Sequence, residues 1–329
     1  MVDRYSKVFS IRSFFMKWEW LLVLIFIVFN IVIINITPQY VNVKSIFDAT
    51  SIFLEKGMIA LIMAFIIISK NIDLSVASIM ALSSVTMAVV YQSGVNMWVS
   101  FLIGLSVGTL CGFINGIIIT KLGFPSIIVT LANYSFYRGI AYVILGDQAV
   151  GGFTKKFSYL GQGYIGNSVV PFSLALFICL AIIAGLILHK TKFGRMIYAI
   201  GWNRNTCFAS GIPVKKIELL LFTLSGFISG LAGMFITSRI ANTRPNIATG
   251  FELEIITIVI LGGVLVSGGV GNMTGVMLSL TLIGTIRYGL GLHNVPGQVM
   301  LLVTGGLLII SILMNNVMKR FLTFKRLKG

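Results

Sequence analysis

The sequence predicts an all-α fold in which about ten helices cross a membrane. Of the 329 residues, 57% are hydrophobic and only 10% are charged, whereas about a quarter of the residues of a soluble domain carry charge. The mean hydropathy is +0.99. Apolar runs recur along the whole chain, and most approach the length of about 20 residues that a helix needs to cross a bilayer. The chain is therefore expected to be a polytopic membrane protein.

The apolar runs give the predicted spans in order. They occupy residues 18–36, 52–69, 72–92, 95–120, 125–145, 171–189, 217–238, 251–267, 273–291 and 296–316. Only Lys70 and Asn71 separate the second run from the third, and residues 262–275 are rich in glycine, so the count ranges from eight to eleven. The first run is too long for a cleavable signal peptide, and the residues after it offer no cleavage site.

Basic residues predict the orientation, because Lys and Arg in short loops favour the cytoplasm. They gather before the first run, in the central loop and after the last run. We expect a cytosolic tail at residues 1–17, one transmembrane domain at 18–316 with a cytosolic loop at 190–216, and a cytosolic tail at 317–329. The net charge of +16 is spread between apolar runs, so we expect the lipid bilayer and not a nucleic acid as its surroundings.

Catalytic and metal-binding patterns are missing from the sequence. There is no HExxH motif and no phosphate-binding loop of the GxxxxGK[ST] type, and the three cysteines have no metal-ligand spacing. An intramembrane serine protease built from Ser106 and His293 is disfavoured, because Ser106 lies among packing glycines. We expect no catalytic residue, no metal and no cofactor bound by this chain.

Glycines predict how the helices meet. Gly104, Gly108, Gly112 and Gly116 recur every fourth residue, which forms a flat stripe for close helix packing. Glycines also gather at residues 262–271, where a broken helix is an open alternative to a continuous span.

Polar residues inside apolar runs are costly and need a role. The candidates for a substrate path are Asp73, Asn115, Asn133, Arg138 and Glu252. Each charged member also has a structural alternative. Asp73 fits a helix N-cap, Glu252 and the nearby Glu254 fit the first turn of a helix, and Arg138 fits hydrogen bonds to backbone carbonyls. Arg287 is a further charged residue within a run.

The central loop is the longest polar interruption of the chain. Its residues 194–212 place apolar and small residues at helical spacing, which predicts a short helix outside the membrane. Such a helix, with Ile197, Tyr198 and Ile200 exposed, would need a partner that receives it in a groove.

Four segments together resemble the membrane permease subunits of ribose-type sugar ABC importers. They are NIDLSVASIMAL at 71–82, GFINGIIITKLGFPSIIVTLANYSFYRGIAYV at 112–143, GRMIYAIGWNRNTCFASGIPV at 194–214 and GFELEIITIVILGGVLVSGGVGNMTG at 250–275. The likeness covers nearly the full length of the chain. Trp202 and the pair Ala132-Asn133 depart from the family pattern.

The resemblance implies a permease that couples to a cytosolic ABC ATPase, which would hold ATP and Mg²⁺. It implies that the coupling residues are Gly194, Arg195, Tyr198, Ala199, Ile200, Gly201, Asn203, Ala209, Ser210, Gly211 and Ile212. A second permease, identical or homologous, would complete the path, and an extracytoplasmic sugar-binding protein would deliver the ligand. The expected place is the bacterial cytoplasmic (inner) membrane.

Further segments, among them GLGLHNVPGQVM, resemble the permeases of rhamnose importers. Autoinducer-2 and ribose permeases share the same framework and stay as alternatives for the substrate. A different class, an ion-coupled secondary transporter with Asp73 and Glu252 as coupling carboxylates, also stays open. That transporter would work without an ATPase.

Overall fold

The computed structural model describes residues 18–297, 299–300, 302–303, 305–307 and 309. Over these residues helices make up nearly all of the regular secondary structure, so the predicted all-α fold class is confirmed. Strands β1 (Val150–Gly151) and β2 (Asn242–Thr243) form one short antiparallel pair in the described part of the chain. The predicted tails at 1–17 and 317–329 lie outside the described residues, as does most of the run at 296–316.

The helices follow the predicted runs closely. They are α2 (Trp18–Ile36), the 3₁₀ helix η1 (Pro38–Val41), α3 (Val43–Thr50), α4 (Leu54–Ile68), α5 (Val76–Gln92), α6 (Met97–Lys121), α7 (Ser126–Leu145), α8 (Lys155–Gln162), α9 (Phe172–Lys190), α10 (Lys192–Trp202), α11 (Arg204–Ala209), α12 (Val214–Ile240), α13 (Phe251–Leu261) and α14 (Met273–Leu292). Each of the first nine runs coincides over most of its length with one of these helices.

Five helices in the described residues are long and apolar enough to cross a membrane: α6, α7, α9, α12 and α14. A sixth span arises if α3 and α4, which meet at a bend of 50°, are counted together. The apolar helices α5 and Leu22–Ile36 are shorter. The molecule is thus a polytopic helical membrane protein, while the predicted number of ten crossings stays a prediction.

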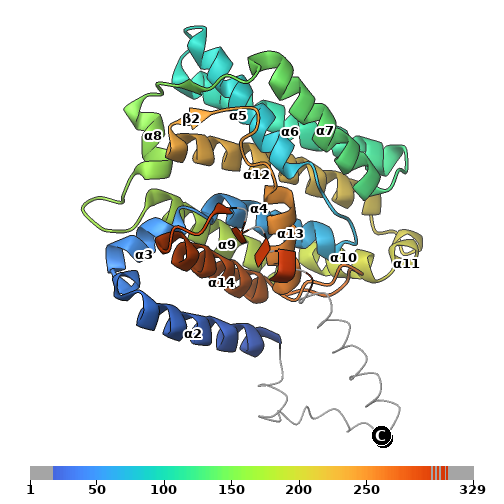
Figure 1. Ribbon diagram of the computed structural model, residues 1–329. Coiled ribbons are helices and arrows are strands. Elements are labelled where there is room, and N and C mark those ends of the chain that lie inside the picture. The colour runs from blue at the N-terminus through green and yellow to red at the C-terminus, as the bar shows by residue number, and fades with distance from the viewer. Residues whose placement is uncertain (1–17, 298, 301, 304, 308, 310–329) are drawn as a thin grey trace, which may run out of the picture.

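Two ends of the helix bundle can be distinguished in Figure 1. The end that holds α10 and α11, at the right, is called the α10 end; α4 and α9 finish there, and α12 and α14 begin there. The opposite end, at the left, holds α3, α8 and β2.

Helix α12 runs through the middle of the bundle and packs against α4, α5 and α6. The glycine stripe of α6 makes the closest contact. A Cβ added at Gly112 would lie 2.3 Å from the carbonyl oxygen of Phe222, and one at Gly226 would lie 2.3 Å from that of Gly108. The predicted packing role of the stripe is confirmed, because the backbones of α6 and α12 approach too closely for larger side chains.

Gly112→Ala is therefore expected to destabilise the protein by about 1–3 kcal/mol, the usual cost of overpacking. The matched control is Gly139→Ala on α7, where an added Cβ meets nothing within 4 Å. That change should be neutral or slightly stabilising, because alanine favours a helix over glycine by about 1 kcal/mol. Thermal unfolding of both variants in detergent checks this, and equal midpoints would contradict it.

Of the two alternatives open for residues 262–271, the structure has the broken helix. Helix α13 ends at Leu261 and α14 begins at Met273. Between them the backbone takes positive φ at Gly263, Gly268 and Gly269, a conformation that glycine adopts without steric cost. This segment, residues 262–272, is called the glycine break.

Candidate functional site

The central loop folds into two short helices at the α10 end. Thr191 caps α10 by accepting a hydrogen bond from the amide of Gly194 at 3.2 Å, and Asn203 caps α11 by accepting one from Thr206 at 3.0 Å. Asn203 also ends α10. The helix predicted at residues 194–212 is therefore two helices, since the extended backbone at Asn203 turns the chain.

The expected exposure of Ile197 and Ile200 is wrong. Both are fully buried, because this face of α10 packs onto the body of the bundle. Tyr198 is half-buried, and its hydroxyl donates a hydrogen bond of 2.8 Å to the carbonyl oxygen of Gly271 in the glycine break. The large apolar side chains that do project outward are Trp202, 80% exposed, and Phe208, 67% exposed.

Gly201 lets α10 touch two other parts of the backbone. An added Cβ at this position would lie 1.8 Å from the carbonyl oxygen of Ile68 and 2.4 Å from the amide nitrogen of Gly269. The amide of Gly269 itself donates to the carbonyl oxygen of Ile68 at 2.8 Å. Helix α10, the end of α4 and the glycine break therefore meet at one point, called the Gly201 contact. Gly194 makes a similar approach, since its Cβ would lie 2.0 Å from the oxygen of Leu188.

Helix α11 is tied to α12 by an ion pair. Arg204 donates from Nε at 2.9 Å and from Nη2 at 2.8 Å to the two carboxylate oxygens of Glu218. This hydrogen bonding raises the pKa of Arg204 above its ordinary value. Asn71, in the loop after α4, donates more weakly to the same carboxylate at 3.4 Å. A bidentate pair fixes orientation as well as distance, so α11 and α12 are held in one arrangement.

The predicted coupling residues divide by exposure. The exposed members are Arg195, Asn203, Ala209, Ser210 and Gly211; the half-buried members are Tyr198, Ala199 and Ile212; the buried members are Gly194, Ile200 and Gly201. The exposed group, together with the exposed side chains of Trp202 and Phe208, is called the outer face of α10 and α11. The buried group lies entirely in α10 and packs this helix against the body of the bundle.

Three of the five path candidates form one hydrogen-bond network. Asp73 accepts from the amide of Ser75 at 3.0 Å, from its hydroxyl at 2.6 Å and from the hydroxyl of Ser225 at 2.7 Å. Asn115 donates to the Ser75 hydroxyl at 2.8 Å and accepts from Asn133 at 2.6 Å. The network joins α5, α6, α7 and α12.

Burial shows which part of this network can meet a solute. Asp73 and Asn115 are fully buried, whereas Asn133 is only partly buried. The three bonds to Asp73 satisfy its carboxylate within the protein, as the capping alternative requires. Because Asp73 accepts from the residue just before α5, it acts at the start of that helix, although Ser75 holds the N-cap position itself.

Arg138 and Glu252 form a second group, away from the α10 end. Arg138 donates from Nη1 to the carbonyl oxygens of Pro245 at 2.5 Å and Ile247 at 2.8 Å, which is the structural alternative foreseen for it. Its Nε and Nη2 atoms and the Oε2 atom of Glu252 are nevertheless buried without a hydrogen-bond partner in the described part of the chain. Arg138 therefore keeps two spare donors and Glu252 one spare acceptor.

The sequence reading missed a buried charge cluster. Lys56 pairs with Glu254 at 2.5 Å, and Arg287 pairs with the other oxygen of the same carboxylate. The Lys56 ammonium also lies 4.1 Å from the ring centroid of Phe251. A second pair joins Glu55 to Arg239 at 2.7 Å. The signal was available, because Glu55 and Lys56 are adjacent charges at the start of an apolar run.

The two glutamates near the start of α13 have different roles. Both Glu252 and Glu254 lie in its first turn, as predicted. Glu254 is the acceptor for two cations that come from α4 and α14, so it holds three helices together. Clusters of three or more His, Cys, Asp or Glu side chains suited to a metal ion do not occur among the described residues.

Comparison with known proteins identifies the family. The profile of the family described as "Branched-chain amino acid transport system / permease component" matches residues 45–312. The chain is 35% identical to the ribose import permease protein RbsC of Bacillus subtilis, over 87% of this chain and 88% of that protein. It is 33% identical to the L-arabinose transport system permease protein AraH of Escherichia coli, over 84% and 83%.

A third relative is the autoinducer 2 import system permease protein LsrD of Photorhabdus temperata, at 29% identity over 91% of each chain. No solved structure matches the chain. The family profile covers well over half of the sequence, and the relatives align along most of their length. The chain therefore belongs to the family of branched-chain amino acid transport system permease components.

Proposed function

We propose that this chain is the permease subunit of an ATP-driven sugar importer in the bacterial cytoplasmic membrane. Its relatives include permeases named for ribose and L-arabinose import. The observation that carries the proposal is the Gly201 contact. It joins the exposed outer face of α10 and α11 to α4 and to the glycine break. A separate ATPase, holding ATP and Mg²⁺, would dock on the outer face.

The contacts suggest how force from that ATPase enters the bundle. Movement of α10 displaces α4 and the glycine break, because their backbones are in direct contact with no side chain between them. Movement of α11 is passed to α12 through Arg204 and Glu218. Since α12 packs against α4, α5 and α6, the centre of the bundle receives both inputs. Alternating access would follow from the resulting rearrangement.

The path for the sugar is proposed to form with a second permease. A neutral sugar needs hydrogen-bond donors and acceptors and no counter-charge. The partly buried residues Asn133, Arg138 and Glu252 supply these groups. Asn115 fixes the position of Asn133 by a direct hydrogen bond, and Asp73 supports Asn115 through Ser75. An extracytoplasmic binding protein would deliver the sugar at the end opposite the α10 end.

This arrangement sets the orientation that we propose. The α10 end faces the cytosol, as the basic residues of the loop at 190–216 indicate. Both termini, with the tails at 1–17 and 317–329, face the same side, and residues 18–316 form a single permease domain. The chain itself would perform no chemistry.

Rhamnose is the sugar that we propose first, on the resemblance of segments such as GLGLHNVPGQVM to rhamnose permeases. Ribose, L-arabinose and autoinducer 2, for which the relatives are named, are the alternative substrates and serve as competitors in the test. The test is uptake of labelled rhamnose by proteoliposomes that contain this chain, a second permease and the ATPase, with the sugar-binding protein supplied on the extracytoplasmic side and each competitor added in excess. Rhamnose uptake that needs ATP and resists the competitors supports the assignment.

The same proteoliposomes separate the proposal from an ion-coupled transporter. Asp73 already has three hydrogen-bond donors and is fully buried, which is a poor arrangement for a carboxylate that must exchange ions with water. We expect ionophores to leave the uptake unchanged and removal of the ATPase to abolish it. Uptake by this chain alone, driven by an ion gradient, would overturn the proposal.

A further inference from the structure

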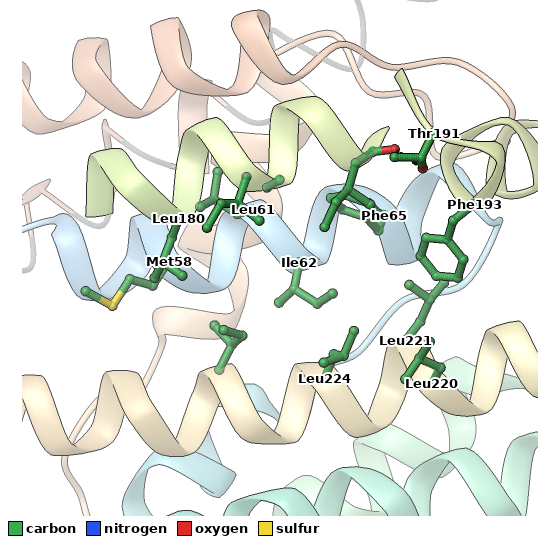
Figure 2. Close-up of a pocket in the computed structure, with 14 residues that line it drawn as sticks. Met58, Leu61, Ile62, Phe65, Leu180, Thr191, Phe193, Leu220, Leu221 and Leu224 are labelled. Atoms are coloured by element: carbon green, nitrogen blue, oxygen red, sulfur yellow. Dashed lines mark hydrogen bonds between the residues drawn. The ribbon is translucent and has the colours of Figure 1, made fainter. Parts of the chain in front are cut away.

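An apolar groove of about 510 Å³ runs along the side of the bundle. Helix α4 forms its floor, and α9 and α12 form its walls (Figure 2). Its lining residues are Met58, Leu61, Ile62, Phe65, Leu180, Ile183, Ala184, Ile187, Thr191, Phe193, Leu220, Leu221, Leu224 and Ile228. The sugar path proposed above uses none of them.

The lining excludes a polar ligand. Thirteen of the 14 residues are apolar. The exception, Thr191, donates its hydroxyl to the carbonyl oxygen of Ile187 at 2.6 Å, so that donor is already used. A sugar or an ion in this groove would lose its hydrogen bonds to water without replacement. The occupant of the groove must be a hydrocarbon.

The groove opens beside exposed apolar residues of two candidate membrane spans. Ile183 is 47% exposed and Leu220 is 45% exposed, and both belong to helices long and apolar enough to span a membrane. A lipid acyl chain is a flexible hydrocarbon, and it can fill a groove of about 510 Å³ with apolar walls. Acyl chains of the bilayer are therefore its natural contents.

Basic residues neighbour the lining of the groove where it reaches the α10 end. Leu220, Leu224 and Ile228 line the groove at every fourth residue of α12, and Lys216 continues that stripe by one more turn. Lys190 and Lys192 flank the lining residue Thr191. All three lysines are exposed, so three cations follow or flank the lining residues at the α10 end of the groove.

We infer that this groove is a binding site for an anionic phospholipid. One acyl chain lies between α9 and α12, and the phosphate and acidic headgroup pair with Lys190, Lys192 and Lys216. Basic pockets between transmembrane helices on the cytoplasmic side favour such headgroups. Phe193 belongs to α10 and lines the groove, so the bound lipid touches the helix that carries the Gly201 contact. The inference requires membrane insertion of the chain and does not depend on the transported solute.

The test uses the purified full chain and a phosphatidylglycerol with a photoreactive acyl chain, compared with a phosphatidylcholine that carries the same chains. We expect at least tenfold more labelling by phosphatidylglycerol, in peptides of α9 and α12. The triple variant Lys190→Gln, Lys192→Gln, Lys216→Gln should remove this preference. The control variant changes three exposed lysines at the opposite end, Lys44, Lys155 and Lys156, to Gln, and should keep it.

The acyl chain is tested separately with Leu224→Trp, which fills the groove, against Val143→Trp, at a position 88% exposed on α7. Labelling of α9 and α12 should fall at least tenfold in the first variant only. Equal labelling by both lipids, or labelling unchanged by Leu224→Trp, would overturn the inference. So would crosslinks showing that another segment of this chain, a second copy or a partner helix fills the groove. Each result can be obtained without a transport assay, so it is independent of the proposed function.

Discussion

Gly201→Ala is expected to lower sugar-stimulated ATPase activity and uptake at least tenfold in the assembled transporter. Its Cβ would lie 1.8 Å from the oxygen of Ile68 and 2.4 Å from the nitrogen of Gly269, so α10 must shift away from both. Overpacking of this kind costs about 1–3 kcal/mol, which leaves the chain folded while the Gly201 contact is broken. The measurement is ATP hydrolysis and labelled uptake in proteoliposomes of equal protein content.

The matched control is Gly185→Ala in α9. An added Cβ there would meet its nearest neighbour, the Met273 side chain, at 4.0 Å, an ordinary contact. This variant should retain full activity. Gly211 makes a third comparison, since it has a positive φ of 80° but open space around it. Gly211→Ala should strain the turn by about 1–3 kcal/mol and reduce activity less than Gly201→Ala. Full activity of the Gly201 variant would contradict the proposed route of force.

Glu254→Gln is expected to destabilise the folded protein by about 3–5 kcal/mol, as removal of one partner from a buried ion pair does. The change leaves both Lys56 and Arg287 without a counter-charge, and their side chains are only 3% and 16% exposed. Arg287→Gln should cost less, because the pair between Lys56 and Glu254 survives. The measurement is thermal unfolding in detergent.

A second substitution sharpens this prediction. Lys56→Gln in the Glu254→Gln background removes one of the two unpaired cations and should recover part of the lost stability. Equal unfolding midpoints for Glu254→Gln and the unchanged protein would show that the charge cluster does not hold α4, α13 and α14 together. A double variant less stable than Glu254→Gln would contradict the same claim.

Composition and periodicity were enough to predict the helices of this fold. Apolar runs of spanning length have few alternatives in a bilayer, so nine runs matched nine helices. The glycine stripe on α6 was equally easy to interpret, because a small residue at every fourth position lets two helices pack closely. The break after Leu261 was left open, since glycine permits a broken helix without requiring one.

Side-chain partners across the sequence were harder to predict. Helical spacing placed Ile197 and Ile200 on one face of α10 but did not show that the bundle covers that face. Lys56 and Glu254 are 198 positions apart in the sequence. The residues around either one give no indication that the two side chains meet. The free-energy cost of a polar side chain in the membrane marks all five path candidates alike, so it does not separate the network around Asp73 from the group of Arg138 and Glu252.

The claim that the outer face of α10 and α11 receives the ATPase is tested most directly by site-specific photocrosslinking in the active complex. A photoreactive phenylalanine at Trp202 or Phe208, the exposed apolar positions of this face, should form an adduct with the ATPase. The same group at Ile165, 44% exposed in the loop after α8, should form none. Adducts at Ile165, or none at Trp202 and Phe208 in a complex that still transports, would contradict the account.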